Sequence, residues 1–249
     1  MKEQTMTTIE TAGVTDVGLR RSTNEDAFVI MPEQLVVAVA DGMGGAAAGE
    51  VASSIFVSAV SEHFAASNAA SEDVAYRLVQ QVFSVANNRM IEHVTRNPHD
   101  SGMGCTAELL TFAGGRYIIG HVGDSRIYLY RNGELRQLTK DHSLVQMQLD
   151  EGMITAEAAR VHPRKNIVLR AVGMEKDIPL DILRGNLLPG DLFLLCSDGL
   201  SDMIEDAEMA AILFATFTLA QKAEQLVESA KKAGGKDNIT VILSHVIHI

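Results

Sequence analysis

The sequence predicts an α+β fold in which blocks of β-strands form a sandwich covered by separate long helices. Apolar runs rich in β-branched residues fall in three blocks, at 29–40, at 106–139, and at 180–196 together with 239–247. A helical periodicity replaces them between residues 49 and 97. Because strands and helices do not alternate regularly, a sandwich is favoured over a doubly wound parallel sheet.

The strand blocks are bounded by turn residues. The first, 29–40, leads directly into Asp41-Gly42. In the second, Gly114-Gly115 and Asn132-Gly133 each separate two apolar runs, and an Asn-Gly pair supplies the positive φ that a tight hairpin turn requires. Residues 106–139 are therefore predicted to form an antiparallel meander.

Helices are predicted where apolar residues recur every three or four positions. Two long amphipathic helices follow from this spacing at Val51, Ile55, Val60 and Phe64, then at Val74, Leu78, Val82, Ala86 and Met90. The charged segment 141–169 carries short helical patterns at 144–151 and 156–161, and we interpret it as an excursion between strands. A last helix over 219–233 ends at Gly234-Gly235, a residue type that tolerates a left-handed helix stop.

Composition excludes several classes of protein. Of the 249 residues 47% are hydrophobic and 21% are charged, as in ordinary globular proteins. Residues 1–13 lack the apolar stretch of a secretory signal, and runs such as 210–213 fall far short of the roughly 18 residues that span a membrane. We therefore expect a soluble, cytoplasmic protein without a membrane partner.

Charge and cysteine content narrow the choice further. The net charge of -11 would repel a phosphate backbone, so nucleic acid is not an expected partner. The two cysteines, Cys105 and Cys196, cannot form a disulfide framework, and no cysteine–histidine cluster has zinc spacing. The surplus of carboxylates raises the question of whether some of them bind cations.

Carboxylates recur at the ends of predicted strands. They lie in five groups: Asn24-Glu25-Asp26, Asp41-Gly42, Gly123-Asp124, Ser197-Asp198-Gly199 and Asp237-Asn238. Any one group is typical of an ordinary turn. If the strands share sheets, however, the five could converge, and converging carboxylates repel one another unless a cation neutralises them. Oxygen ligands without Cys or His select Mg²⁺ or Mn²⁺ over zinc.

The glycine-rich loop after Asp41 has an alternative interpretation. Gly42-x-Gly44-x-x-Ala47 formally matches a dinucleotide fingerprint. The match is weak, because a pyrophosphate would sit beside Asp41 and the expected second strand is replaced by a helix. Close approach of the backbone to an ion, with the Gly42 carbonyl as a ligand, explains these glycines better.

Histidine and cysteine offer less. No His-x-His or His-Glu-x-x-His pattern is present among the eight histidines, so a zinc hydrolase is not supported. His121, inside a strand, is predicted to be a hydrogen-bonded core side chain. His142 and His162 flank the excursion, where a role near substrate stays open. Cys196 lies in an apolar run and is predicted to be inert.

Eight ordered segments carry a family resemblance. They are Arg21-Ser22-Thr23-Asn24-Glu25-Asp26, Val39-Ala40-Asp41-Gly42-Met43-Gly44-Gly45, Gly102-Met103-Gly104-Cys105-Thr106, Gly120-His121-Val122-Gly123-Asp124-Ser125-Arg126, Leu138-Thr139-Lys140-Asp141-His142-Ser143, His162-Pro163, Ser197-Asp198-Gly199-Leu200 and Gly235-Lys236-Asp237-Asn238-Ile239-Thr240. From about residue 11 to 246 the chain resembles the type 2C metal-dependent serine/threonine protein phosphatases, the PPM family, in their compact bacterial form. The resemblance implies a single domain over 1–249, with two antiparallel sheets flanked by helices on both sides and a flap subdomain at about 144–168.

The resemblance also implies a role for each matching residue. It implies two Mn²⁺ or Mg²⁺ ions that Asp41 bridges, with the Gly42 carbonyl bound to one ion and Asp198 and Asp237 bound to the other. Glu25 and Asp26 would hold metal-bound waters, and Asp124 would bind a third ion. Arg21 would bind the substrate phosphate, and Asn238 would support the ligands from behind. Arg21, Asp41 and Asp198 are thus the expected catalytic residues. A guanidinium suits a bidentate grip on phosphate, which a lysine would not reproduce.

Three positions depart from the family pattern. Met43 and Ala46 stand where relatives carry histidines, so neither supplies a proton to the leaving alkoxide. Cys105 replaces a common Thr, and little effect is expected because its neighbours in the motif are intact.

The implied function is hydrolysis of phosphoserine and phosphothreonine on proteins. Two ions would orient a bridging hydroxide for in-line attack without a phospho-enzyme. The expected partners are phosphorylated proteins and a bacterial serine/threonine kinase that the enzyme opposes, and a monomer is expected. The alternative is an inactive pseudophosphatase that binds phosphoproteins. A two-metal nuclease also fits the ligand chemistry but is opposed by the net charge. The flap is expected to tune substrate choice and not metal binding.

Overall fold

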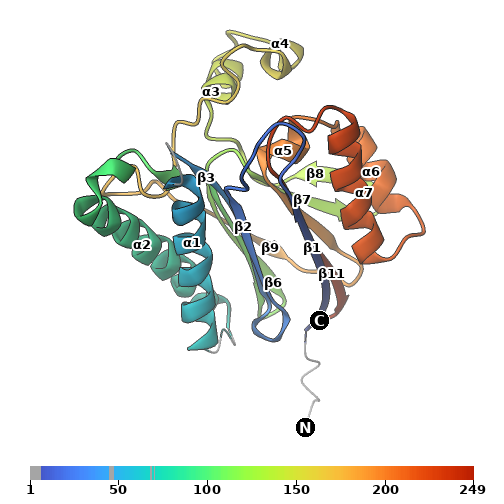
Figure 1. The fold of residues 1–249 in the computed structure, drawn as a ribbon. Helices are drawn as coiled ribbons and strands as arrows, with labels where there is room; N and C mark the ends of the chain where they lie inside the picture. The colour runs from blue at the N-terminus through green and yellow to red at the C-terminus, as the bar shows by residue number, and fades with distance from the viewer. Residues whose placement is uncertain (1–6, 45–47, 68, 70) are drawn as a thin grey trace.

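The computed structural model describes residues 7–44, 48–67, 69 and 71–249. It is a four-layer arrangement in which two β-sheets lie face to face between two pairs of helices (Figure 1). The five-stranded sheet has the order β1 (Thr8–Asp16), β11 (Ile239–His248), β10 (Leu192–Cys196), β7 (Arg126–Arg131) and β8 (Glu134–Gln137). In the other sheet the order is β2 (Asp26–Met31), β3 (Val36–Met43), β5 (Ala107–Ala113), β6 (Arg116–Val122) and β9 (Asp181–Asn186), with β4 (Gly104–Cys105) paired to the end of β3. The described pairings are antiparallel, so the predicted fold class is confirmed.

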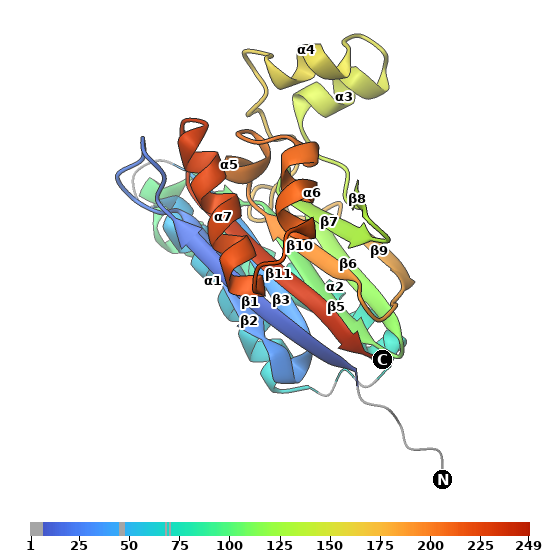
Figure 2. The same cartoon turned by 90° about the vertical axis from the view of Figure 1, so that its right-hand side faces the viewer.

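Helices cover the outer face of each sheet. The predicted long helices are α1 (Ala48–Ala65) and α2 (Glu72–Arg96), which pack on the six-stranded sheet. On the other side, α6 (Asp206–Phe214) and α7 (Leu219–Lys232) cover the five-stranded sheet (Figure 2). Thr218 and Gln221 form a capping box that begins α7, a reciprocal arrangement that satisfies two helix N-terminal donors. Short helices complete the described part: η1 (Pro32–Gln34), η2 (Pro98–Asp100), α3 (Leu144–Asp150), α4 (Ala156–Arg160) and α5 (Asp198–Ser201).

Strand β3 shows how the sequence separates the layers. Successive side chains of a strand point to opposite faces. Val36, Ala38 and Ala40 accordingly pack in the cluster that includes α1 and α2, whereas Val37 and Val39 pack between the two sheets. These residues are fully buried, so the apolar run of β3 is continuous and does not alternate with polar residues.

Among the elements that were not predicted are strand β1 and helix α6. Strand β1 (Thr8–Asp16) has few apolar residues and lies at the edge of its sheet, so its sequence resembles a polar leader. Helix α6 spans only nine residues, too few to display a clear periodicity. The predicted hairpin at Asn132-Gly133 is confirmed, because both residues have positive φ, 54° and 84°.

The excursion of the chain between β8 and β9 carries α3 and α4, which stand above the ends of the strands (Figures 1 and 2). Its two legs are joined by hydrogen bonds from Leu144 N to Ile167 O (2.9 Å) and from Leu169 N to His142 O (2.7 Å). We call residues 144–168 the flap. No helix in the described part of the chain is long and apolar enough to span a membrane.

Candidate active site

A cavity of about 430 Å³ opens where strand ends of both sheets meet below the flap. It is lined by seven of the predicted site residues, namely Arg21, Glu25, Asp41, Gly42, Asp124, Asp198 and Asp237. Met43, Gly44, Thr106 and flap residues 166–168 complete the lining. The strand-end carboxylates that the sequence singled out therefore converge. The other two predicted site residues, Asp26 and Asn238, lie directly behind the residues that line the cavity.

Asp41 is held at the end of β3 by its backbone. Thr106 N donates to Asp41 O (2.9 Å), and Asp41 N donates to Thr106 Oγ1 (3.1 Å). The next residue, Gly42, has no room for a side chain, because a Cβ there would lie 2.0 Å from Gly49 O and 2.6 Å from Glu25 O. Its glycine therefore permits close packing of three backbone segments around the cavity.

Asp198 begins the short helix α5, directly after β10. Its Oδ1 is buried without a hydrogen-bond partner among the described residues. Asp26 is similar, since its Oδ1 is also buried and unpartnered while Oδ2 accepts from Ser197 Oγ (2.8 Å) and Thr240 Oγ1 (2.6 Å). A buried carboxylate oxygen without a donor is costly, and a cation or its bound water would relieve that cost.

Asn238 joins the loop that carries Arg21 to the start of β11. Its Oδ1 accepts from Glu25 N (2.8 Å), and its Nδ2 donates to Thr23 O (2.9 Å) and Val17 O (3.1 Å). Beside it, Arg21 Nη2 donates to Asp237 Oδ2 (2.8 Å). The ion-pair partner of Arg21 is thus Asp237, at the opposite end of the sequence.

Burial and mutual repulsion favour the protonated forms of these carboxyls. Desolvation is the largest cause in each case. It raises the pKa of Asp41 and Asp198 well above the ordinary value, with added repulsion from Asp26 on Asp41 and from Asp124 on Asp198. The pKa of Asp26 rises to about 6 and that of Asp124 to about 7. Such a site is suited to a cation, because positive charge reverses both effects.

The donor set fits hard divalent cations. It consists of carboxylate oxygens and the Gly42 carbonyl, without thiolate or imidazole, as Mg²⁺ and Mn²⁺ prefer. No three Asp, Glu, His or Cys side chains of the described residues already form a group that could hold one ion. Water and the backbone carbonyl would therefore have to complete the coordination, which is usual for Mg²⁺.

The structure also reveals supporting residues that the sequence did not single out. Thr106 bonds to Asp41 and, through Oγ1, to Ser125 Oγ (2.8 Å), so it connects the loops of Asp41 and Asp124. Ser197 and Thr240 hold Asp26. Both Thr106 and Ser197 stand inside the ordered segments of the sequence, and that position was the available signal.

The histidines and cysteines of the described residues do not line the cavity. His121 is fully buried and hydrogen-bonded, as predicted. His142 and His162 do not line the cavity. Burial raises the pKa of both Cys105 and Cys196, which keeps the thiols protonated and unreactive. Met43 offers no proton, and Ala46 lies outside the described residues.

A second cavity of about 240 Å³ separates the flap from the core. Asp124 and Asp198 line it as well as the first cavity. Lys165 Nζ of the flap pairs with Asp202 Oδ2 (2.5 Å) across it. The flap thus borders the carboxylate site directly.

Comparisons with known proteins agree with one another. A model of the family described as protein phosphatase 2C matches residues 20–241. The serine/threonine phosphatase stp of Listeria innocua is 41% identical over 234 residues, covering 92% of this chain and 92% of that protein. The crystal structure of the serine/threonine phosphatase PstP/Ppp of Mycobacterium tuberculosis has a TM-score of 0.90 at 37% identity and covers 97% of this chain and 100% of its own. A structure of the PstP catalytic domain in complex with two manganese ions has a TM-score of 0.89 at 36% identity, covering 98% and 100%.

Proposed function

Because this chain belongs to the protein phosphatase 2C family and is a serine/threonine protein phosphatase, we propose that the carboxylate cavity is its metal-dependent active site. The observation that carries the proposal is the convergence of Asp41, Asp198 and Asp237 on one cavity, with Asp198 Oδ1 buried and without a hydrogen-bond partner in the described part of the chain. The net charge of -11 opposes the nuclease alternative.

Asp41 is proposed to bridge two divalent cations, with the Gly42 carbonyl on one and Asp198 and Asp237 on the other. Such cations, when bound, activate a water as the nucleophile and offset charge on the transferring phosphoryl group. Either Mn²⁺ or Mg²⁺ fits the oxygen donors, and the PstP domain with two manganese ions is the relative that supports Mn²⁺. Asp124 is proposed to hold a third ion, and Glu25 and Asp26 to orient bound water.

Arg21 is proposed to bind the substrate phosphate. Its side chain is 49% exposed and lies in the cavity lining beside Asp237. A guanidinium presents paired donors that match two phosphate oxygens. Asn238 would keep the Arg21 loop in register with Asp237, because it bonds to three backbone positions of that loop.

The substrates are proposed to be phosphoproteins of a serine/threonine kinase that this enzyme opposes in the cytoplasm. We further propose that residues 1–249 act as one monomeric catalytic domain. The flap, which borders both cavities, would select among substrates and leave metal binding unchanged. Exchange of residues 144–168 for those of a relative tests this, and unchanged selectivity among phosphopeptides would count against it.

The decisive experiment is hydrolysis of a phosphothreonine peptide in Mn²⁺, in Mg²⁺ and in excess chelator, with Asp198→Asn beside the wild-type chain. We expect phosphate release that requires a cation and is lost in the variant. Release that continues in chelator, or that survives in Asp198→Asn, would overturn the proposed site. A folded wild-type chain without release in any metal would favour the pseudophosphatase alternative, which nothing in the cavity supports.

A further inference from the structure

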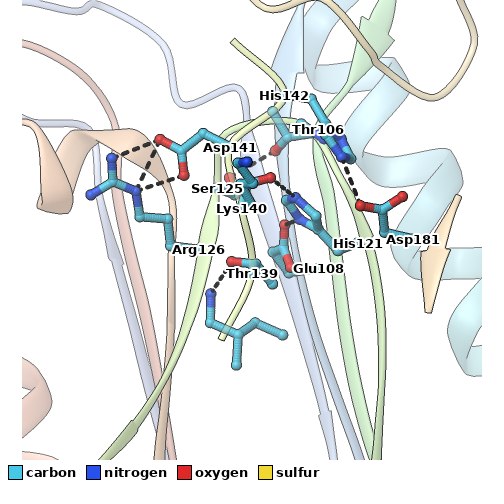
Figure 3. Close-up of polar contacts among 12 residues, drawn as sticks. Thr106, Glu108, His121, Ser125, Arg126, Thr139, Lys140, Asp141, His142 and Asp181 are labelled. Carbon is cyan, nitrogen blue, oxygen red and sulfur yellow. Dashed lines mark hydrogen bonds and ion pairs between the residues drawn. The ribbon is translucent and has the colours of Figure 1, made fainter. Parts of the chain in front are cut away.

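The base of the flap is hydrogen-bonded, residue by residue, to the segment that carries Asp124 (Figure 3). We call residues 138–142 the flap base and residues 123–125 the Asp124 loop. The contacts are Leu138 N to Ile127 O (2.8 Å), Ile127 N to Thr139 Oγ1 (3.1 Å), His121 Nε2 to Lys140 O (2.8 Å), Arg126 to both oxygens of Asp141 (2.7 to 3.1 Å), and His142 N to Gly123 O (2.7 Å). Five consecutive residues are thereby fixed before the flap begins.

His142 closes this set with a second bond to the Asp124 loop. Gly123 N donates to His142 Nδ1 (3.1 Å), so backbone and side chain of His142 together satisfy both polar groups of Gly123. Gly123 has a φ of 119°, and a Cβ there would lie 2.5 Å from the Cβ of Thr106. The loop is therefore packed against Thr106 on one side and held by His142 on the other.

The hydrogen bonds define the protonation of His142. Because Nδ1 accepts from an amide, it carries no proton, and the proton on Nε2 is directed to Asp181 Oδ2 (3.2 Å). Arg170 lies near the same nitrogen and pairs with Asp181 Oδ1 (3.5 Å). Burial and the neighbouring His121 lower the pKa of His142 to about 4, which agrees with the neutral ring.

His121 supports that ring from below. It is fully buried, with Nδ1 bonded to Glu108 Oε1 (2.5 Å) and Nε2 donating to Lys140 O. Because both ring nitrogens of His121 face acceptors, the second ring proton is shared between His121 Nδ1 and Glu108 Oε1. The two imidazole rings lie 4.4 Å apart (Figure 3). His121 therefore holds the backbone at Lys140 by a hydrogen bond and packs its ring against the ring of His142.

His142 also contacts the returning leg of the flap, because its carbonyl oxygen accepts from Leu169 N (2.7 Å). One residue of the outgoing leg thus bonds to the returning leg and to the Asp124 loop. We propose that His142 is a positioning residue that locks the Asp124 loop to the flap base, so that the two move as one unit. Only the expected effect on metal affinity rests on the proposed role of Asp124 as a cation ligand.

Replacement of His142 by asparagine or by glutamine distinguishes this positioning role from a general structural role. In the variant His142→Asn, the amide oxygen would take the position of Nδ1 and accept from Gly123 N. In His142→Gln the longer side chain reaches the Nε2 position and leaves Gly123 N without an acceptor. The test therefore compares His142→Asn with His142→Gln and His142→Leu. Asp181→Ala is the matched control, because it removes the partner of Nε2 and leaves the Gly123 contact intact.

The first readout needs no catalysis. Amide hydrogen exchange of Gly123 in chelator should rise about tenfold in His142→Gln and His142→Leu, and stay near wild type in His142→Asn and Asp181→Ala. Trypsin cleavage in the flap, at Arg160, Arg164 or Lys165, should accelerate in the same two variants. The second readout is direct Mn²⁺ binding by electron paramagnetic resonance, where the weakest class of sites should lose about tenfold in affinity.

Equal Gly123 exchange in the Asn and Gln variants would overturn the proposal, as would a faster exchange without faster flap cleavage. If His142→Leu does not fold, the Asn and Gln comparison decides alone, and circular dichroism establishes that both are folded. Absence of phosphatase activity from the wild-type chain would contradict the proposed function but would leave the hydrogen-exchange result for Gly123 valid, so the two failures are distinguishable.

Discussion

Arg21 Nη2 lies 2.8 Å from Asp237 Oδ2, and this bond joins the two ends of the chain across the proposed active site. The guanidinium forms an ion pair with a carboxylate that is itself a proposed cation ligand. A cation bound at Asp237 would supply that positive charge, and Arg21 would become free to bind phosphate. Metal binding and substrate binding are therefore expected to depend on the same pair.

Replacement of Arg21 tests that dependence. For Arg21→Ala we expect kcat/KM on a phosphopeptide to fall about 10- to 150-fold, because a hydrogen bond to a charged group contributes about 1.5–3 kcal/mol. Arg21→Lys keeps the charge but not the paired donors and should recover only part of the loss. Arg20→Ala, an exposed neighbour, is the control. Equal kinetics for the Arg20 and Arg21 variants would contradict the phosphate role.

Asp198→Asn is expected to separate stability from activity. Desolvation and repulsion from Asp124, Asp202 and Asp237 raise the pKa of Asp198, so a neutral amide should increase the Tm of the metal-free protein. The same variant should reduce phosphate release at least about a hundredfold and lose the rise in Tm that Mn²⁺ gives the wild type. Thermal unfolding with and without chelator measures both effects.

Glu208→Gln on α6 removes one negative charge at an exposed position and serves as the control. It should change neither the metal-free Tm nor the response to Mn²⁺. An Asp198→Asn protein that is less stable than wild type in chelator would show that burial and repulsion of the charge do not govern stability at this carboxyl.

The sequence was sufficient for the fold class and for the carboxylates, because both depend on local patterns. Apolar runs rich in β-branched residues marked the strands, and Asp41, Asp124 and Asp198 each follow such a run. Strand β1 was missed because an edge strand needs few apolar residues. The order of strands, the bond of Arg21 to Asp237 and the contacts of Thr106 depend on which distant segments meet, and periodicity contains no information on that.

The stability of the metal-free protein should fall as pH rises. Burial raises the pKa of Asp26 from 3.8 to about 6 and that of Asp124 from 3.8 to about 7. A carboxyl with a folded pKa above its unfolded value binds protons more tightly in the folded state. Its stabilising effect is therefore complete below about pH 4 and is lost between about pH 4 and pH 7. The Tm in chelator, measured across this range, should decrease.

Asp26→Asn tests the origin of this slope. The amide keeps a carbonyl oxygen that can accept from Ser197 and Thr240, and it has no proton to lose in this range. Its Tm should vary less with pH than that of the wild type. With Mn²⁺ present the wild-type trend should be offset, because cation binding requires deprotonated ligands and strengthens as pH rises. An identical slope in wild type and Asp26→Asn would exclude Asp26 as a cause.

The Arg126–Asp141 ion pair is expected to matter far more for stability than its neighbour Lys140–Asp150. Asp141 is 8% exposed and accepts from Arg126 Nε and Nη2, whereas the side chains of Lys140 and Asp150 are 62% and 40% exposed. Removal of one partner from a buried pair leaves an uncompensated charge and costs about 3–5 kcal/mol. We expect that loss for Asp141→Leu, and at most about 1 kcal/mol for Lys140→Met.

Urea unfolding of both variants and of the double variant Arg126→Met/Asp141→Leu measures these values. The double variant should recover much of the loss, because no unpaired charge then stays buried, and equal costs for the two single variants would contradict the burial argument.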